Sequence, residues 1–275
     1  MRAGATGARR GLRGGWGLRA IGRLCVRGVT VVLILGGGVA EALVLRPKTR
    51  LARAQWTHRQ CRRLLAGLGV TVTVEGTFPR EGALITNHQG YLDILVLASV
   101  APCVFVSKAE IAGWPVIGWM TTTAGTVYVE RGKGGSGAAA SVRLRAAAAD
   151  GLPVVFFPEG TTSDGEALLP FHGGMLAEAR AAGMAVTPGV LRYAVAGPVG
   201  ATVADEVAYW GDRGMLEHVA RFLTLVGLQA RVQFAATPLG FTTDDRKAAA
   251  TEAHADVLQL AAGGLRDGSE TVPGR

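Results

Sequence analysis

The stretch ALITNHQGYLDILVLAS, residues 83–99, decides the fold class. It begins as a short apolar β-type run, passes through a polar turn and continues as an apolar helical pattern. The same alternation recurs along the chain, and it predicts an α/β fold with a mixed, largely parallel sheet flanked by helices. Strands are predicted at 70–75, 83–86, 103–107, 126–130, 153–157, 186–191 and 231–235, and helices at 91–99, 114–120, 137–149, 173–182 and 244–262, the last with Thr243 as its N-cap.

The composition and the charge distribution narrow the class of protein. The chain has 275 residues, of which 49% are hydrophobic, so a disordered chain is excluded and one sizeable core is possible. Three scattered cysteines are too few for a disulfide scaffold and suggest a reducing compartment. Residues 1–63 carry fourteen Arg or Lys and one acid, whereas residues 64–275 carry fifteen bases and twenty acids. This division argues against a nucleic-acid-binding protein and favours an anionic membrane surface as the partner of the basic segment.

The basic segment surrounds an apolar run at residues 28–45, interrupted by the single charge of Glu41. As a helix, this run would span about 27 Å, which is marginal for a bilayer core of about 30 Å. Basic residues lie on both sides, so the run fits a spanning helix and an interfacial helix equally well. A cleaved signal peptide is the alternative, but no small-residue cleavage site follows. We expect a retained membrane anchor.

This anchor gives the expected organisation of the chain. Residues 1–57 form a basic N-terminal segment with the anchor, residues 58–262 form the catalytic domain, and residues 263–275 form a flexible tail. Residues 50–68 carry apolar side chains at helical spacing with arginines on the other faces, which predicts a basic amphipathic helix across the first boundary.

The sequence lacks the G-x-S-x-G, G-x-x-x-x-G-K-[ST] and H-E-x-x-H motifs of three common catalytic classes. Its candidate reactive residue is His88, in the turn after the strand predicted at 83–86. His88 can act as a general base if a carboxylate fixes its tautomer, and Asp93 lies five positions further on. An isolated pair of this spacing is more often a polar turn residue followed by an acid in the first turn of a helix.

Other polar residues follow neighbouring strands of the predicted sheet. The stretch FPEGTTSDG, residues 157–165, could present backbone amides to an oxyanion or a phosphate, or it could be an ordinary turn. Lys108 and Arg131 each follow a strand and would suit an anionic head group if both strands run parallel. As isolated residues they could equally be solvated surface charges.

In this order and spacing, these elements resemble the glycerolipid acyltransferase family of the 1-acylglycerol-3-phosphate O-acyltransferase type. The resemblance covers roughly residues 55–262. Its blocks are the N-H-x4-D motif from Asn87 to Asp93, Lys108, the strand that ends in Arg131, the F-P-E-G-T motif at 157–161 and the Pro-containing run VTPGV at 186–190.

The resemblance implies a glycerol-phosphate acyltransferase-like fold and direct acyl transfer from a thioester of acyl carrier protein or coenzyme A. The acceptor would be the free hydroxyl of 1-acyl-sn-glycerol-3-phosphate, and the product phosphatidic acid. His88 would remove the hydroxyl proton and Asp93 would orient it, with no metal and no bound cofactor. The implied substrate-binding residues are Asn87, Lys108, Arg131, Glu159, Gly160, Thr161 and Thr162. The enzyme would lie on the cytoplasmic face of the inner membrane, as a single-pass or monotopic protein.

One departure from the family pattern concerns the acceptor. Thr162 stands where members that use lysophosphatidic acid often carry Arg, which weakens the case for phosphate recognition. Residues 161–165, 169–171 and 210–212 resemble the lyso-ornithine lipid acyltransferase branch, whose acceptor has an amino-acid head group. That acceptor is the main alternative, and a non-catalytic membrane lipid-binding scaffold is a remote one. The remaining histidines match no family motif and are expected to be structural: His58, His172, His218 and His254.

Overall fold

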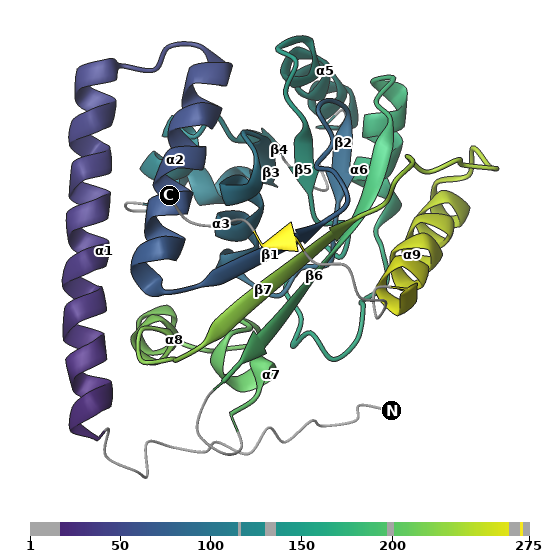
Figure 1. The fold of residues 1–275 in the computed structure, drawn as a ribbon. Helices are drawn as coiled ribbons and strands as arrows, with labels where there is room; N and C mark the ends of the chain where they lie inside the picture. Colours follow the sequence, from purple (N-terminus) through teal and green to yellow (C-terminus); the bar gives the residue numbers. More distant parts are fainter. Residues whose placement is uncertain (1–16, 115–116, 130–135, 197–200, 264–269, 272–275) are drawn as a thin grey trace.

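The computed structural model describes residues 17–114, 117–129, 136–196, 201–263 and 270–271 (Figure 1). Its helices are α1 (Leu18–Leu45), α2 (Arg50–Leu68), α3 (Tyr91–Val100), the 3-10 turn η1 (Ala109–Gly113), α4 (Ile117–Thr123), α5 (Ser136–Ala149), α6 (Gly173–Ala181), α7 (Val203–Glu206), α8 (Met215–Phe222) and α9 (Arg246–Gly263). Its strands are β1 (Thr71–Glu75), β2 (Ala83–Ile85), β3 (Val104–Lys108), β4 (Val127–Val129), β5 (Val154–Phe156), β6 (Val186–Val195), β7 (Leu228–Phe234) and β8 (Glu270–Thr271).

The strands form one mixed sheet in the order β4-β3-β5-β2-β6-β7-β1-β8. The pairs β2–β5, β2–β6, β3–β4, β3–β5 and β1–β7 are parallel, whereas β6–β7 and β1–β8 are antiparallel. The predicted α/β class with a largely parallel sheet is therefore confirmed. Because β2 lies between two parallel neighbours, the loop that follows it opens at the carboxyl edge of the sheet, where α/β folds place their sites.

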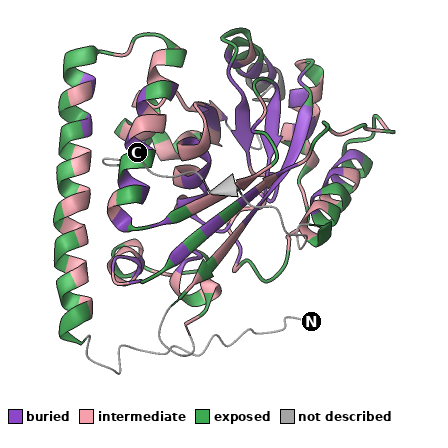
Figure 2. Cartoon of the chain, in the orientation of Figure 1, coloured by how far each residue is buried: buried purple, intermediate pink, exposed green. Residues whose placement is uncertain are grey.

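Helices cover both faces of the sheet, and the central strands β2 and β5 and the first part of β6 are buried throughout (Figure 2). Successive side chains of β2 alternate between the two faces. Leu84 packs with residues of α2, α3 and α8, whereas Ile85 packs with residues of α5, α6 and α9. Both side chains are completely buried, which explains why this strand is a continuous apolar run in the sequence.

Several elements differ from their predicted bounds. Strand β6 continues to Val195 and β7 begins at Leu228, because the two strands pair antiparallel from Gly189↔Phe234 to Val195↔Leu228. The paired residues extend beyond the apolar runs from which these two strands were predicted. Helix α9 begins at Arg246, since the Asp245 side chain accepts the amide of Ala248 at 2.8 Å and caps the helix in place of the predicted Thr243.

Helix α1 packs along α2 (Figure 1), and Gly38, the last of its three consecutive glycines, lies at the contact. A Cβ on Gly38 would lie 2.9 Å from the Gln60 side-chain oxygen, and the Trp56 indole donates to the Gly38 carbonyl at 3.2 Å. The Glu41 carboxylate accepts from Arg59 at 2.8 Å and from Arg63 at 2.5 Å. The single charge in the apolar run therefore ties α1 to α2.

The predicted anchor at 28–45 is part of a longer helix, because α1 begins at Leu18. Arg23 donates to the Thr224 carbonyl at 2.9 Å and Arg27 donates to the Leu223 carbonyl at 3.2 Å, which holds the basic first turns against the end of α8. Helix α1 is long and apolar enough to cross a membrane. Its outward face exposes Leu18, Ile21, Val26, Val29, Val32, Leu33, Val39, Leu43, Val44 and Leu45.

Two of the predicted domain boundaries, at residues 57–58 and 262–263, lie at or near regular secondary structure. The division between residues 57 and 58 lies inside α2, so the N-terminal segment and the rest of the chain share a helix. Most of the tail at 263–275 lies outside the described residues. Within it, Glu270–Thr271 pairs with β1 as strand β8.

Candidate active site

The site begins with the loop that follows β2, which is joined to β6 by the side chain of Asn87. The Asn87 amide donates to the Leu191 carbonyl at 2.9 Å, and its carbonyl accepts the Leu191 amide at 2.8 Å. This reciprocal pair continues the β2–β6 ladder through a side chain. Asn87 was expected to bind substrate, and the structure shows it fixing the backbone that carries the next residue.

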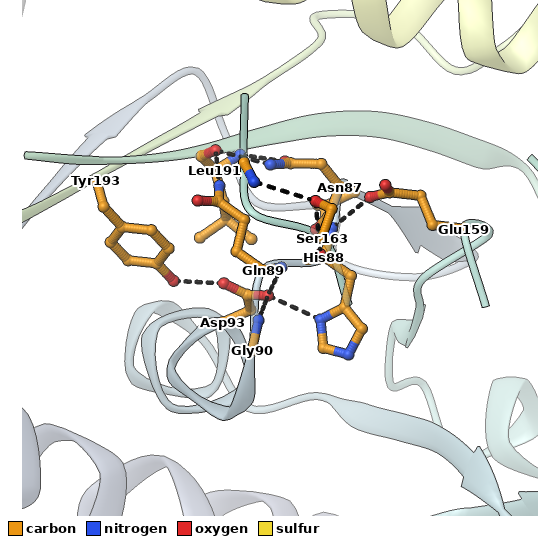
Figure 3. A network of polar contacts seen from close by, with 11 residues as sticks. Asn87, His88, Gln89, Gly90, Asp93, Glu159, Ser163, Leu191 and Tyr193 are labelled. Carbon is orange, nitrogen blue, oxygen red and sulfur yellow. Dashed lines mark hydrogen bonds and ion pairs between the residues drawn. The ribbon is translucent and has the colours of Figure 1, made fainter. Parts of the chain in front are cut away.

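His88 and Asp93 are in direct contact, with His88 Nδ1 2.7 Å from Asp93 Oδ2 (Figure 3). Asp93 lies in the first turn of α3 and is completely buried, whereas the side chain of His88 remains 17% exposed. Oδ2 also accepts the amides of Gln89 at 2.6 Å and Gly90 at 2.9 Å. Since Oδ2 accepts these bonds, Nδ1 is the donor in the contact with His88, which leaves Nε2 as the nitrogen able to accept a proton.

Tyr193 contributes a donor to the same carboxylate from another part of the fold. Its hydroxyl donates to Asp93 Oδ1 at 2.6 Å. Tyr193 lies on β6 two residues after Leu191, on the face of the sheet that α3 covers. Sequence analysis missed this residue, because it belongs to no motif and lies 100 positions from Asp93.

The ring of His88 is held flat against Phe157, which follows β5. The two ring centroids lie 3.8 Å apart and the ring planes differ by 8°. Together with the Asp93 contact, this stacking fixes both the direction and the plane of the imidazole.

Glu159 holds the backbone of His88 in place. Its side chain accepts the His88 amide at 2.6 Å on one oxygen and the Leu169 amide at 2.9 Å on the other. Glu159 is 2% exposed, and this burial raises the pKa of the carboxyl group. Both oxygens of this carboxylate bond backbone amides, so Glu159 shapes the site by holding the His88 backbone, and its contact with an acceptor stays a prediction.

The loop after β5 returns to His88 at a second point. Gly160 adopts a φ of +71°, which favours glycine, and it turns the chain so that Thr161 is exposed and Thr162 half-buried. The Ser163 amide then donates to the His88 carbonyl at 2.9 Å. Gly160, Thr161 and Thr162 therefore lie between two residues that bond the His88 backbone, and their contact with a substrate stays a prediction.

Lys108 lies at the carboxyl end of β3 and is exposed. Phe105 of β3 and Leu84 of β2 both pair with Val155 of β5, which lies between them. Lys108 and Asn87, each three residues further on, are therefore level with each other across two strand spacings, or about 10 Å between their Cα atoms. Lys108 thus lies on the predicted edge. Arg131, expected beside it after β4, lies outside the described residues.

The other histidines have contacts of their own. His58 bonds the Ala98 carbonyl at 2.8 Å, His254 bonds the Leu168 carbonyl at 3.4 Å, and buried His218 bonds the Tyr91 hydroxyl at 3.0 Å. The side chain of His172 is exposed, and its backbone amide donates to the Pro158 carbonyl. Among the residues that the structure describes, no group of three or more His, Cys, Asp or Glu side chains is placed to hold a metal ion.

The fold and the site together define a class of protein: an α/β protein with a hydrogen-bonded His–Asp pair at the carboxyl edge of its sheet. Comparison with known proteins gives the family. The family model described as Acyltransferase matches residues 69–192. The lyso-ornithine lipid O-acyltransferase of Pseudomonas aeruginosa is 37% identical over 210 residues, which are 73% of this chain and 79% of that protein.

A 1-acyl-sn-glycerol-3-phosphate acyltransferase of Neisseria meningitidis is 32% identical over 190 residues, which are 68% of this chain and 73% of that protein. The crystal structure of the 1-acyl-sn-glycerophosphate acyltransferase PlsC from Thermotoga maritima has the same fold, with a TM-score of 0.61 and 19% identity over 90% of this chain and 97% of that one. This protein therefore belongs to the acyltransferase family, and the resemblance seen in the sequence is confirmed.

Proposed function

We propose that this protein is a membrane-associated lysolipid O-acyltransferase that moves a fatty acyl group from an acyl thioester to the free hydroxyl of a lysolipid. The observation that carries the proposal is the 2.7 Å contact between His88 Nδ1 and the buried Asp93 carboxylate. It leaves the second nitrogen of a partly exposed imidazole available as a base. The turn that holds Gly160, Thr161 and Thr162 lies beside this imidazole, where an acceptor can be bound.

In the proposed reaction, His88 Nε2 takes the proton of the acceptor hydroxyl while the oxygen attacks the thioester carbonyl carbon. The resulting imidazolium is stabilised by Asp93. When the tetrahedral intermediate collapses, the carbon–sulfur bond breaks and the thiolate takes the proton back from His88. The products are an ester and a free thiol, on acyl carrier protein or coenzyme A.

We favour lyso-ornithine lipid as the acceptor. Proteins with that name from Pseudomonas aeruginosa and Rhodobacter capsulatus are 37% and 33% identical to this chain. Thr162 supports the same acceptor, because a hydroxyl replaces the cation that a phosphate would favour. The segments that resemble this branch also adjoin the site, since the Leu169 amide bonds Glu159 and the Tyr209 amide donates to the Gln89 carbonyl at 2.8 Å.

Lysophosphatidic acid is the second candidate acceptor, with phosphatidic acid as the product. The Neisseria meningitidis relative carries that function in its name, at 32% identity. Lys108, on the catalytic edge, is a cation that could bind the phosphate, and Arg131 would assist it.

We propose that the exposed apolar face of α1 lies in the membrane, where both lipids reside. Membrane lipids as substrates and the basic residues around α1 support this placement. Acyl carrier protein and coenzyme A thioesters are cytoplasmic, so we place the site on the cytoplasmic face of the inner membrane.

The decisive experiment offers one labelled acyl thioester to the purified protein with lyso-ornithine lipid or lysophosphatidic acid. We expect acylation of lyso-ornithine lipid, loss of product in His88→Ala, and retained product in His172→Ala, which removes an exposed imidazole outside the pair. Product from lysophosphatidic acid alone would make the second candidate correct. Equal turnover by His88→Ala and the wild type would contradict the mechanism, and lipid binding without turnover by any form would favour a scaffold.

A further inference from the structure

We infer that Tyr193 is a positioning residue for the His88–Asp93 pair, and that its hydroxyl sets how strongly Asp93 supports a positive charge on His88. No sequence motif includes Tyr193, and the inference rests on the proposed role of His88 as the base. It goes beyond that role by assigning control of the base to a residue on a different strand.

The first argument concerns the four groups that donate hydrogen bonds to the Asp93 carboxylate. Three of the four come from the residues just before it: His88 Nδ1 and the amides of Gln89 and Gly90, all on Oδ2. Tyr193 supplies the fourth, on Oδ1, from β6. The donors of the turn all bond Oδ2, which orients the rigid carboxylate, and Tyr193 supplies a donor to its other oxygen, Oδ1.

The second argument is the state of the Tyr193 hydroxyl. Burial and the adjacent Asp93 carboxylate raise the pKa of Tyr193 well above its ordinary value. The hydroxyl therefore stays protonated and acts as a donor over the whole range in which an imidazole titrates. The contact also lies next to a fully buried carboxylate, where a hydrogen bond to a charge is strong.

A donor on Oδ1 draws negative charge away from Oδ2. With Tyr193 in place, Asp93 stabilises the His88 imidazolium less than a carboxylate without that donor would, and His88 more readily returns its proton to the leaving thiolate. Glu159 is a second titratable group that faces this pair: it accepts the His88 backbone amide, and its charge interacts with both His88 and Asp93.

The first test is a spectroscopic titration of the His88 ring, which does not require turnover. Ring signals of the five histidines are recorded against pH, and His88→Ala identifies the His88 signal. In Tyr193→Phe, we expect the titration midpoint of this signal to rise by roughly half to one pH unit, because the imidazolium gains support. A midpoint that stays within about 0.1 unit of the wild type, or moves down, would overturn the inference.

The second test measures acyl transfer by the same variant. We expect kcat to fall roughly threefold to tenfold, because a His88 whose midpoint is raised by this amount returns its proton to the thiolate more slowly, with KM changed less than twofold. The acid limb of the rate profile should move upward with the ring signal. A lower thermal midpoint with unchanged kcat and an unchanged acid limb would mean that Tyr193 is merely structural.

Tyr209→Phe is the matched control, because the Tyr209 hydroxyl bonds the Arg213 carbonyl at 3.1 Å and makes no contact with Asp93. We expect its titration midpoint to equal that of the wild type. A fluorinated tyrosine at position 193 gives the opposite perturbation with the side chain retained. Its stronger donor should lower the midpoint, and a rise would contradict the inference even if Tyr193→Phe folded poorly.

The two proposals fail in different ways. If His88→Ala retains full turnover, the proposed mechanism is wrong whatever Tyr193 does to the ring signal. If turnover depends on His88 while Tyr193→Phe leaves the midpoint and kcat unchanged, the mechanism stands and the inference about Tyr193 is wrong.

Discussion

Replacing Asp93 by Asn separates the charge of this residue from its geometry. The Asn oxygen can take the place of Oδ2 and still accept from His88 and from the amides of Gln89 and Gly90. The new amide group then faces Tyr193, whose hydroxyl can rotate to accept from it. The variant should therefore keep these contacts and lose the negative charge.

Two independent arguments give the size of the effect on catalysis. A hydrogen bond to a charged group contributes about 1–2 kcal/mol more than a neutral one, which corresponds to a roughly tenfold change in rate. Charges about 4 Å apart at an effective dielectric constant near 20 interact by about 4 kcal/mol, which corresponds to roughly a thousandfold. We expect kcat for Asp93→Asn to fall between these limits, roughly a hundredfold.

Stability should respond differently. Asp93→Asn removes a buried charge but leaves the Tyr193 O–H proton and one N–H of the new amide without an acceptor, so its free energy of unfolding should fall by about 1–2 kcal/mol. Asp93→Ala leaves two backbone amides and the Tyr193 hydroxyl without this acceptor, and should cost about 3 kcal/mol or more.

Thiol release from the acyl donor gives the rate, and thermal or urea unfolding gives the stability. An Asp93→Asn protein that turns over within twofold of the wild type would refute the role of the charge. A variant as unstable as Asp93→Ala would refute the proposed exchange of hydrogen bonds with Tyr193.

Three further perturbations test the supports of the site and the membrane face. Burial raises the pKa of Glu159 above its usual 4.5, so its ionisation makes wild-type stability fall as pH rises through and above 4.5. Glu159→Gln removes that contribution, so the difference in free energy of unfolding between the wild type and this variant, measured in urea, should favour the wild type most at acid pH. A difference that increasingly favours the wild type as pH rises would contradict the raised pKa of Glu159. Asn87→Ala, which leaves the Leu191 amide without its acceptor and removes one of the two side-chain donors to the Leu191 carbonyl, should lower the free energy of unfolding by about 1–3 kcal/mol, measured in urea. Leu33→Glu, at a position 68% exposed on α1, should reduce sedimentation with anionic vesicles, whereas Leu258→Glu on α9 should not; equal binding by both would place the membrane contact elsewhere.

The sequence predicted the fold class and the position of the site, because both depend on local patterns. The fully buried run at β2 is apolar throughout, and the polar residues after it mark the carboxyl edge of a parallel sheet. The contact between His88 and Asp93 follows from a turn that leads directly into a helix, which the spacing of five residues allows.

The hydrogen bonds that hold His88 and Asp93 in place could not be predicted in the same way. The bonds from Asn87 to Leu191 and from Tyr193 to Asp93 join residues about 100 positions apart, and only the order of the strands brings them together. The role of Glu159 was also hidden, since a carboxylate in a polar turn is usually solvated. Here it is enclosed because the loop after β5 folds back over it and supplies two backbone amides.

The loop after β5 has a consequence for how such enzymes diversify. Thr161 and Thr162, the positions that we expect to meet the acceptor, lie between two residues that hold the backbone of His88, namely Glu159 and Ser163. A substitution that reshapes the loop for a new head group should therefore also shift His88. The same loop therefore affects both the choice of acceptor lipid and the rate of the reaction. Substitutions at these two positions that change the acceptor should at first lower the rate. Further substitutions elsewhere in the loop should then restore it.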